Sequence, residues 1–370
     1  MHASLGVAAV WPVIMVGSSP PGRQAHRALS RRNVRLLDAV GLGNPCVDLL
    51  LNLPRLPEPD ESMAVNALSW QGGGKVPTAL VALSRLGAKA GVIAAIGDDA
   101  LGRFIIEDFR RHGVDTSGVV TRDGEHSAFS VVLSDLATRS RSILWNPGTV
   151  APLSAEEVDN AYLLGSRMIL LSGAGPLEFA AAEAARRSGV MILMDADHFD
   201  GGLLEIAPLV DYFIASEDFA REWMPSRSPE TVLNAIAGLG PQVSVITLGS
   251  RGCAMHTNGT ITHCPACDVE AVDTTGAGDV FHGAFAFGVL KRWSPEYCCR
   301  FANAVSGIKC TRIGGRAGIP TREETERFMR TGYIELADAD ELCRLYSRAP
   351  GDSTMPPSQH VRPVSLAKDF

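Results

Sequence analysis

One stretch near the C-terminal end of this 370-residue chain, residues 272–283, constrains the fold most. It reads Val-Asp-Thr-Thr-Gly-Ala-Gly-Asp-Val-Phe-His-Gly: a glycine turn, an acid, and then an apolar run with helical character. Such a turn leaves successive backbone N–H groups unpaired at a helix start, and the helix dipole adds positive potential there. The stretch therefore predicts an anion site, with Asp279 placed to take a proton from a hydroxyl that attacks the anion. A capped helix that follows a strand is the alternative interpretation.

The seven residues 273–279 resemble the C-terminal signature of the ribokinase (PfkB-type) family of sugar and nucleoside kinases. The resemblance implies an anion hole for the transferred phosphoryl group and a catalytic base next to it. These residues are Gly276, Ala277 and Gly278 for the hole and Asp279 for the base. In potassium-activated members a monovalent cation lies beside the hole. Asp273 would be its carboxylate ligand, and residues 312–316 would form the neighbouring loop.

A second stretch, Gln-Gly-Gly-Gly-Lys at residues 71–75, precedes a predicted buried helix that ends at Gly87. It is not a phosphate-binding P-loop, because Val76 stands where that motif requires Ser or Thr. It resembles the family's N-terminal signature, with Thr78 where the family usually has a sugar-contacting Asn. Lys75 is either a contact for an anionic substituent or a surface lysine. The resemblance assigns substrate binding to Asp48, Gly73, Gly74, Lys75, Thr78 and Asn146.

The first predicted strand ends at Gly41 and Gly43, which mimic the start of a dinucleotide-binding fingerprint. The third glycine of that fingerprint is missing and Pro45 stands where its helix would open, which disfavours NAD binding. Asp48 lies just past this strand, at the edge where open parallel sheets bind ligands. The family resemblance makes Asp48 a holder of sugar hydroxyls.

From residue 154 onward, apolar strands alternate with helices, which predicts a parallel sheet with helices on both faces. Asp195 and Asp197 end one of these strands at the ligand-binding edge. The predicted fold class is α/β: by resemblance, a ribokinase-like three-layer sandwich with a mostly parallel central sheet and a small antiparallel β lid. The lid would come from residues 49–71 and 118–145, close over the sugar and form a homodimer.

The kinase domain would span residues 37–331. Residues 1–36 form an arginine-rich arm without acids, interpreted as a non-core extension, a transit segment or the product of an upstream start. Residues 332–370 would form a short helix followed by a disordered, proline-containing tail. Arg139 and Arg141, in the predicted lid, would either bind a negatively charged substrate or protect an edge strand from aggregation.

Residues 247–252, Thr-Leu-Gly-Ser-Arg-Gly, resemble the turn that packs along ATP in this family. The predicted cofactors are ATP and Mg²⁺, with K⁺ as an optional third. Ser216-Glu217-Asp218 lies where the family carries Asn-x-x-Glu near the magnesium. Glu217 or Asp218 would serve instead, unless the two acids simply cap a helix. The predicted nucleotide-binding residues are Thr247, Gly249, Gly252 and Asn303, and Glu217 is assigned to the magnesium region.

The composition of the chain indicates which classes of binding partner and which cellular compartment to expect. The formal net charge of −7 disfavours a general nucleic-acid binder. No apolar run reaches the ~18–20 residues that cross a bilayer, so no membrane partner is expected. The eight cysteines are irregularly spaced and do not form a disulfide framework, so a cytoplasmic location fits best. The lone C-x-x-C at residues 264–267 is interpreted as half-buried strand cysteines rather than a metal or redox site.

These features predict an ATP-dependent kinase that phosphorylates a hydroxyl of a small sugar or sugar derivative. A nucleoside, a sugar phosphate or a sulfosugar are alternative substrates for the same fold. A non-catalytic relative that senses a sugar or a nucleotide is the alternative from another class. Thr78 and the altered residues 216–218 keep this last alternative open.

Overall fold

The computed structural model describes residues 37–138 and 140–351. The predicted N-terminal extension, residues 1–36, and most of the predicted tail therefore lie outside the described residues.

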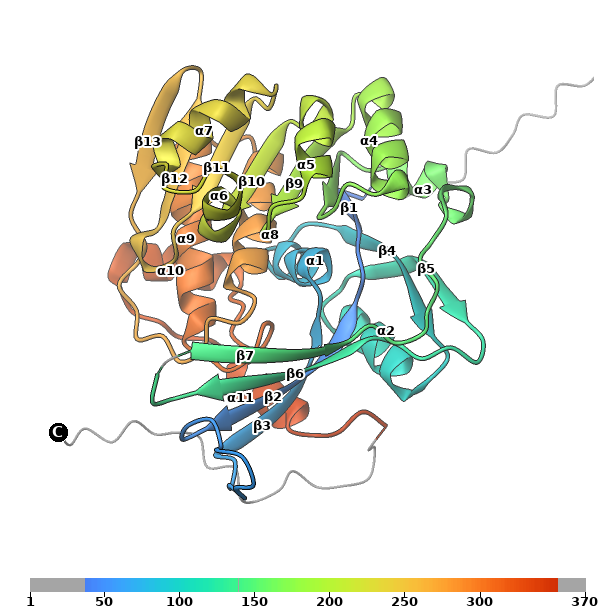
Figure 1. Ribbon diagram of the computed structural model, residues 1–370, viewed down its shortest axis with the longest axis vertical. Coiled ribbons are helices and arrows are strands. Elements are labelled where there is room, and N and C mark those ends of the chain that lie inside the picture. Colours follow the sequence, from blue (N-terminus) through green and yellow to red (C-terminus); the bar gives the residue numbers. More distant parts are fainter. Residues whose placement is uncertain (1–36, 139, 352–370) are drawn as a thin grey trace, which may run out of the picture. The chain divides into compact units, whose positions relative to one another are not determined.

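The large sheet has nine strands, and its topology sets the position of the site. In spatial order the strands are β13 (Thr260–Cys264), β12 (Cys253–Thr257), β11 (Val243–Thr247), β10 (Tyr212–Ser216), β9 (Met191–Ala196), β8 (Met168–Leu171), β1 (Ala39–Leu42), β4 (Ala90–Gly97) and β5 (Asp115–Arg122). All neighbours from β11 to β5 are parallel, and the β12–β13 hairpin adds two antiparallel strands. The predicted mostly parallel sheet is confirmed (Figure 1).

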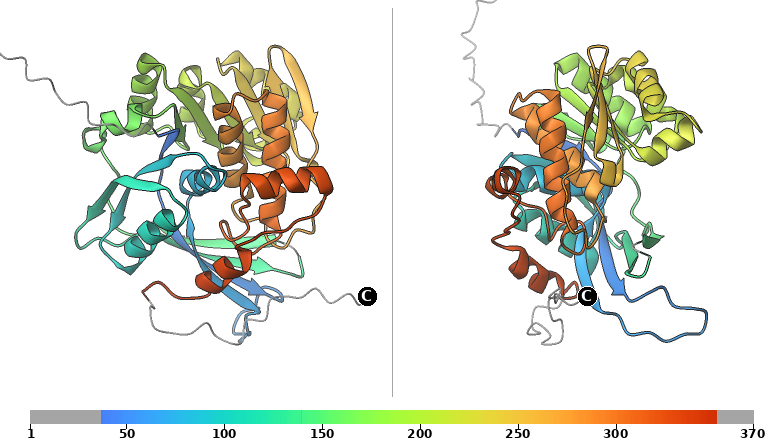
Figure 2. Two further views of the ribbon diagram at one scale, coloured as in Figure 1. Left: turned by 180° about the vertical axis from the view of Figure 1, so that it is seen from behind. Right: turned by 90° about the vertical axis from the view of Figure 1, so that its left-hand side faces the viewer.

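Two apolar cores, one on each face of this sheet, produce the layers. Met168 and Leu170 of β8 enter one core, whereas Ile169 and Leu171 enter the other, as expected for a parallel strand buried on both faces. The first core is covered by α1 (Lys75–Arg85), α2 (Ala100–Arg111), α8 (Ala277–Leu290) and α9 (Pro295–Cys310). The second is covered by α3 (Asn160–Leu164), α4 (Pro176–Ser188), α5 (Gly201–Ile206), α6 (Glu217–Trp223) and α7 (Pro229–Gly238). Figure 2 shows the sheet between the two helix layers, which confirms the three-layer sandwich.

Helix α8 lies at the centre of the first layer and is buried on almost every side. Ten of its residues are buried, because it packs against α1, α9 and the sheet. An apolar surface all round is typical of such a buried helix. Neither α8 nor any other described helix is long and apolar enough to cross a membrane.

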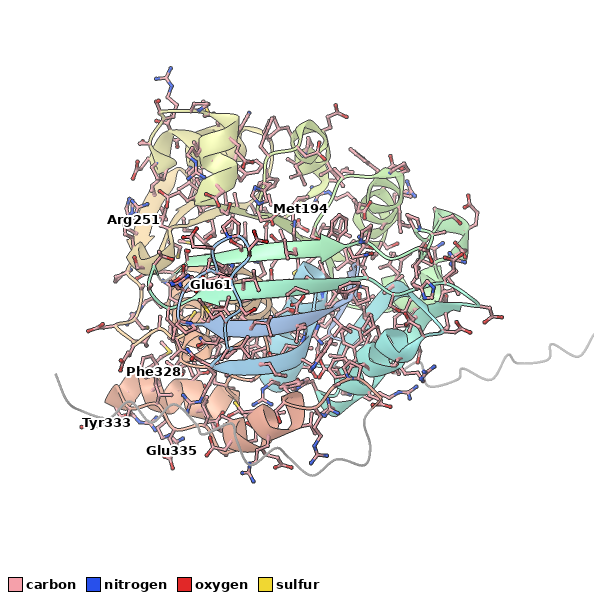
Figure 3. All side chains as sticks on the ribbon, turned by 60° about the horizontal axis from the view of Figure 1, so that its bottom comes forward. Glu61, Met194, Arg251, Phe328, Tyr333 and Glu335 are labelled. Atoms are coloured by element: carbon pink, nitrogen blue, oxygen red, sulfur yellow. The ribbon has the colours of Figure 1, made fainter. Side chains whose placement is uncertain are left out.

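The lid is a second, four-stranded sheet. Its strands, in spatial order, are β3 (Ala67–Gly73), β2 (Cys46–Leu53), β6 (Phe129–Asp135) and β7 (Ser140–Asn146). The pairs β3–β2 and β6–β7 are antiparallel, while β2 and β6 run parallel. In Figure 3 the four strands cross the middle of the view, with Glu61 labelled on the loop that joins β2 to β3.

One part of the predicted lid belongs elsewhere. Residues 118–122 are the end of β5, which pairs with β4 at the edge of the large sheet. The prediction failed because Val119 and Val120 are only half-buried there. An edge strand of a parallel sheet then shows the same mixed pattern as a strand of a small solvated sheet.

Two helices follow the last turn of the sandwich. These are α10 (Arg322–Thr331) and α11 (Ala339–Tyr346), the second in the segment where a short helix is predicted. Asp338 pairs with Arg85 of α1 through two 2.9 Å bonds, and the Tyr346 side chain is completely buried. Short 3₁₀ helices complete the fold at Ala155–Glu157, Ala207–Leu209 and Gly249–Arg251.

Candidate active site

The turn predicted as an anion hole opens α8, beside the carboxyl end of β9. Gly276 caps the helix with φ of 73°, a left-handed conformation that glycine adopts without strain. Ala277 donates its N–H to the Thr274 carbonyl at 3.1 Å, because the turn closes on itself just before the helix. The N–H groups of Gly276, Gly278 and Asp279 donate to no acceptor within the described chain. Two of the three predicted amides are therefore free, and the Asp279 amide joins them in place of the Ala277 amide.

Asp279 carries a half-buried carboxylate on the first turn of α8. Among the residues that the structure describes, none donates a hydrogen bond to this carboxylate. Desolvation by the surrounding protein and the nearby Asp195 carboxylate raise its pKa well above the usual value. A carboxylate without a hydrogen-bond partner and with a raised pKa is a stronger proton acceptor than an ordinary aspartate.

Lys75, at the start of α1, supplies the positive charge of the site. Its Nζ lies 2.5 Å from Oδ1 of Asp197, and both side chains are partly exposed. Burial lowers the pKa of Lys75, but the bond to Asp197 and the carboxylates of Asp195 and Asp279 more than offset this, so the net shift is upward. Lys75 therefore stays charged beside the predicted base.

Asp195, at the end of β9, is buried and lacks a hydrogen bond on both carboxylate oxygens. His282 of α8 places its Nε2 3.3 Å from Oδ1, close enough for charge attraction but outside hydrogen-bond geometry. Desolvation raises the pKa of Asp195, although His282 opposes the shift. The strand-end pattern places Asp195 and Asp197 at this edge, but it does not reveal that Asp195 lacks a partner.

Asp48, the predicted sugar-binding acid, lies on β2 within the lid. It accepts hydrogen bonds from Ser130 Oγ at 2.5 Å and from Cys46 Sγ at 3.4 Å. Burial raises its pKa, and these two bonds oppose the shift. A Cβ atom on Gly73 would lie 2.3 Å from Asp48 Oδ2, and one on Gly72 would lie 2.0 Å from an Arg316 nitrogen. Only glycine fits at these two positions, which explains part of the Gly-Gly-Gly run.

The lid contributes two further contacts, one from Ser130, which the sequence does not single out, and one from Arg141. Arg139, which was predicted together with Arg141, lies outside the described residues. Ser130, on β6, binds Asp48 as described above. Arg141, on β7, donates from Nη1 to Oγ1 of Thr274 at 2.9 Å and so reaches the turn before α8. No local sequence signal identifies Ser130, because it is one of several small polar residues in an alternating strand.

The other two predicted substrate contacts differ in their placement. Thr78 is buried on α1, and its methyl carbon lies 3.6 Å from where a Cβ on Gly276 would be. It therefore packs against the anion-hole turn. Asn146 ends β7, is exposed, and accepts the Gly148 N–H on Oδ1 at 2.8 Å. Its side chain stabilises its own turn in this conformation.

The predicted monovalent-cation ligand, Asp273, is fully engaged by protein groups. Its Oδ1 accepts the Thr275 amide and its Oδ2 accepts the Gly314 amide, both at 2.8 Å. The Nζ of Lys309 donates to the main-chain carbonyls of Asp273 and Thr275. Burial raises the pKa of Asp273, but Lys309 and the two amides outweigh it, so the net shift is downward. These residues do not fit a K⁺ ion at this position, which corrects the prediction.

The predicted nucleotide-binding residues surround the β11–β12 turn. Asn303 of α9 donates from Nδ2 to the carbonyls of Cys264 and Pro265, at 3.1 and 3.0 Å. Thr247 ends β11, and both Gly249 and Gly252 have positive φ in the turn that follows. The four residues therefore share one corner of the carboxyl edge.

Ser216 caps α6, while Glu217 and Asp218 lie on the first turn of this helix and do not form the cap. Ser216 Oγ accepts the Phe219 amide at 2.9 Å and donates to the Asp197 carbonyl. Glu217 is bound by Arg251, which Figure 3 labels, so its carboxylate is not free for a metal. Among the described acids at this edge, Asp195 offers unpartnered oxygens of the kind that Mg²⁺ prefers.

The two cysteines of the C-x-x-C pair do not act together. Cys264 groups with Cys253 and Cys299 in the core, where the three sulfur atoms lie within 4.8 Å of one another. Cys267 is half-buried outside this group, and all eight cysteines are free thiols. The sulfur group lies behind the β12–β13 hairpin and is not part of the carboxylate site.

A cavity of about 1010 Å³ lies at the opposite edge of the sheet. It is lined by the first residues of β9, β10 and β11, which are Met191, Tyr212 and Val243. Ligands of open parallel sheets bind at the carboxyl ends of the strands. This cavity is therefore not the candidate active site.

Free amides, a positive helix end and an unpartnered carboxylate meet at the carboxyl edge of an α/β sheet. These features define a phosphotransferase with an alcohol group as acceptor. A family model described as pfkB family carbohydrate kinase matches residues 37–322, and the chain belongs to this family.

Characterised relatives agree with this assignment. The chain is 28% identical over 297 residues to ribokinase from Haemophilus influenzae, covering 78% of this chain and 97% of that protein. It is 29% identical over 300 residues to an ATP-dependent ribose-1-phosphate kinase from Halopiger xanaduensis, covering 80% and 98%. The crystal structure of ribokinase from Thermotoga maritima superposes with a TM-score of 0.71 at 26% identity, covering 80% of this chain and 100% of that one. The predicted family and the predicted enzyme class are thus confirmed.

Proposed function

We propose that this protein uses ATP to phosphorylate a hydroxyl of a small sugar or sugar derivative, with Asp279 as the base. One observation carries the proposal: the unpartnered Asp279 carboxylate lies on the same helical turn as the free amides of Gly278 and Asp279. A base and an anion hole side by side are what in-line transfer to a hydroxyl requires.

The chemistry follows from these groups. Asp279 accepts the proton of the substrate hydroxyl. At the same time the hydroxyl oxygen forms a bond to the γ-phosphorus of ATP, and the bond between this phosphorus and ADP breaks. The free amides and the positive end of α8 stabilise the charge on the transferred group, and they need no reorganisation to do so. The raised pKa of Asp279 makes its carboxylate a stronger base, which favours proton transfer from the hydroxyl.

Asp195 is the residue that we assign to Mg²⁺, which would neutralise phosphate charge when bound. The unpartnered oxygens of Asp195 support this assignment. Glu217 is not included, because Arg251 holds it. We assign the nucleotide to the corner formed by Thr247, Gly249, Gly252 and Asn303.

The sugar would lie between the lid and the start of α1. Asp48 is the proposed hydroxyl ligand, with the backbone of Gly73 and Gly74 beside it. The ammonium of Lys75 favours a substrate with an anionic substituent, because binding such a group would exchange one anion, Asp197, for another. A sugar phosphate or a sulfosugar is therefore the second candidate substrate class.

We further propose that the lid forms a homodimer and that the protein works in a reducing compartment such as the cytoplasm. Ile143, Leu144 and Trp145 of β7 are all more than half exposed, which supports an apolar contact there. Eight unpaired cysteines support the reducing compartment. Light scattering of the purified protein tests the dimer, and a monomeric mass would contradict it.

A panel assay tests the function. Purified protein with Mg-ATP is offered neutral sugars, nucleosides, sugar phosphates and sulfosugars, and ADP release is followed. We expect sustained ADP release with at least one sugar or sugar derivative, and preference for an anionic one if Lys75 binds its substituent. Nucleotide binding without ADP release on any acceptor would contradict the proposal and favour a sensing role.

A further inference from the structure

Lys309 is a charged side chain that the proposed chemistry has not yet used. It lies one residue before the end of α9 and is completely buried. No carboxylate within the described residues forms an ion pair with it. Its Nζ instead donates to the main-chain carbonyl of Asp273 at 2.9 Å and, at shorter range, to that of Thr275.

These two carbonyls belong to the turn that presents the anion-hole amides. Thr275 directly precedes Gly276, and Asp273 fastens the same turn through its side chain to the amides of Thr275 and Gly314. Ser306, one turn earlier on α9, donates to the Ala277 carbonyl at 2.8 Å. Helix α9 therefore binds the carbonyls of this turn through Ser306 and Lys309, and of these two side chains only Lys309 is charged.

We propose that Lys309 is a tethered monovalent cation, which fixes the anion-hole turn and makes the enzyme independent of added K⁺. The inference rests on the proposed phosphoryl transfer for its effect on turnover. An ammonium group and a K⁺ ion carry the same charge, have similar radii, and bind carbonyl oxygens at similar distances. A chain that already carries an ammonium group against these carbonyls has no place for a free ion there.

The energetics argue against Lys309 as a mere filler of space. Burying an ammonium group is unfavourable unless polar groups compensate, and an apolar side chain of similar length would fill the volume without that penalty. Burial lowers the pKa of Lys309, and the Cys310 thiol and the carboxylates of Asp273 and Asp279 offset this shift only in part. In its charged form, Lys309 both anchors the turn and attracts the phosphoryl group. A lysine flanked by Ile308 and Cys310 in an otherwise apolar helix end was the sequence signal for it.

Turnover in different salts is the first test. We expect the wild-type protein to turn over at the same rate, within about twofold, in KCl, NaCl and tetramethylammonium chloride of equal ionic strength. We expect Lys309→Ala to lose at least about tenfold in kcat in tetramethylammonium chloride, which is about 1.4 kcal/mol on the barrier. NH₄Cl or KCl should restore much of this loss, since either ion can enter the space left by the ammonium. Lys89→Ala, which removes an exposed lysine, is the matched control and should respond to no salt.

Thermal unfolding gives a second readout that needs no substrate. The melting temperature of Lys309→Ala should rise in KCl or NH₄Cl relative to tetramethylammonium chloride, whereas that of the wild type should not change. This result does not depend on whether any acceptor in the panel is phosphorylated. The melting temperatures therefore test the role of Lys309 separately from the proposed kinase activity. Wild-type turnover that rises severalfold with K⁺ would overturn the inference, even if Lys309→Ala does not fold. Full turnover of Lys309→Ala without any small cation would overturn it as well.

Discussion

The pKa values of two aspartates that the protein surrounds, Asp279 and Asp108, shift in opposite directions. Asp108, on α2, is completely buried and accepts hydrogen bonds from Arg316, from Arg111 at 3.0 Å and from the Tyr346 hydroxyl at 2.7 Å. Burial raises the pKa of Asp108, but Arg316 and its other partners outweigh this, so the net shift is downward. Asp279 has no such partner, and its pKa is raised. A carboxylate whose oxygens accept several hydrogen bonds stabilises the fold, whereas a carboxylate without hydrogen-bond partners remains available to accept a proton.

The two regions meet at one loop. Arg316, the main partner of Asp108, donates from Nη2 to the Gly73 carbonyl at 3.2 Å. Gly73 in turn borders Asp48 in the proposed sugar site. The buried network therefore supports the loop on which the substrate would rest, and the C-terminal helix α11 completes this network through Tyr346.

The largest expected effect is on stability, at Asp108. Asp108→Ala leaves Arg316 buried without its carboxylate, which should lower the free energy of unfolding by about 3–5 kcal/mol. Chemical denaturation measures this loss, and Asp218→Ala, an exposed aspartate of α6, is the matched control. We expect kcat per folded molecule to change little. A stability equal to that of the wild type would contradict the structural role of Asp108.

The second effect is the pH dependence of stability near Asp108. His112 bonds to the Tyr346 hydroxyl at 2.7 Å, and burial lowers its pKa from 6.5 to about 4. The unfolded chain therefore binds a proton on His112 that the folded chain does not. Stability should fall as pH decreases from 6.5 to about 4, by about 3 kcal/mol in total.

His112→Gln removes this titration, so its free energy of unfolding should vary less over the same pH range. Urea denaturation at a series of pH values compares the two proteins. An identical slope for the wild type and His112→Gln would show that His112 does not titrate as its burial implies.

The smallest expected effect is a shift in the pH dependence of kcat/KM, through the pKa of Asp279. Asp195→Asn removes the negative charge that, after desolvation, contributes most to the raised pKa of Asp279. The pKa of Asp279 should fall, so the acid limb of the kcat/KM profile should move to lower pH, whatever the height of its plateau. A limb that stays in place or moves to higher pH would remove Asp195 from this role.

The sequence predicted the two regions unequally, for a physical reason. The alternation of strands and helices is local, so the fold class was predicted correctly. The Asp279 turn is seven contiguous residues, so its position at the start of a helix could also be predicted from the sequence, and its catalytic role stays a prediction. The Asp108 network joins residues 108, 316 and 346, which only the folded chain brings together. Its one local signal is an acid between Ile105 and Phe109 on the buried face of α2. The K⁺ assignment to Asp273 failed for the same reason, because Lys309 lies 34 and 36 residues away from the carbonyls it binds.

The most direct test of the account is kcat of Asp279→Asn, measured alongside its ATP affinity and its stability. The substitution removes the base but no hydrogen bond from any described residue. We expect kcat to fall by at least about 10²–10³, with ATP affinity unchanged and the denaturation midpoint equal to or above that of the wild type. Wild-type turnover by Asp279→Asn would contradict the central claim that this unpartnered carboxylate is the base.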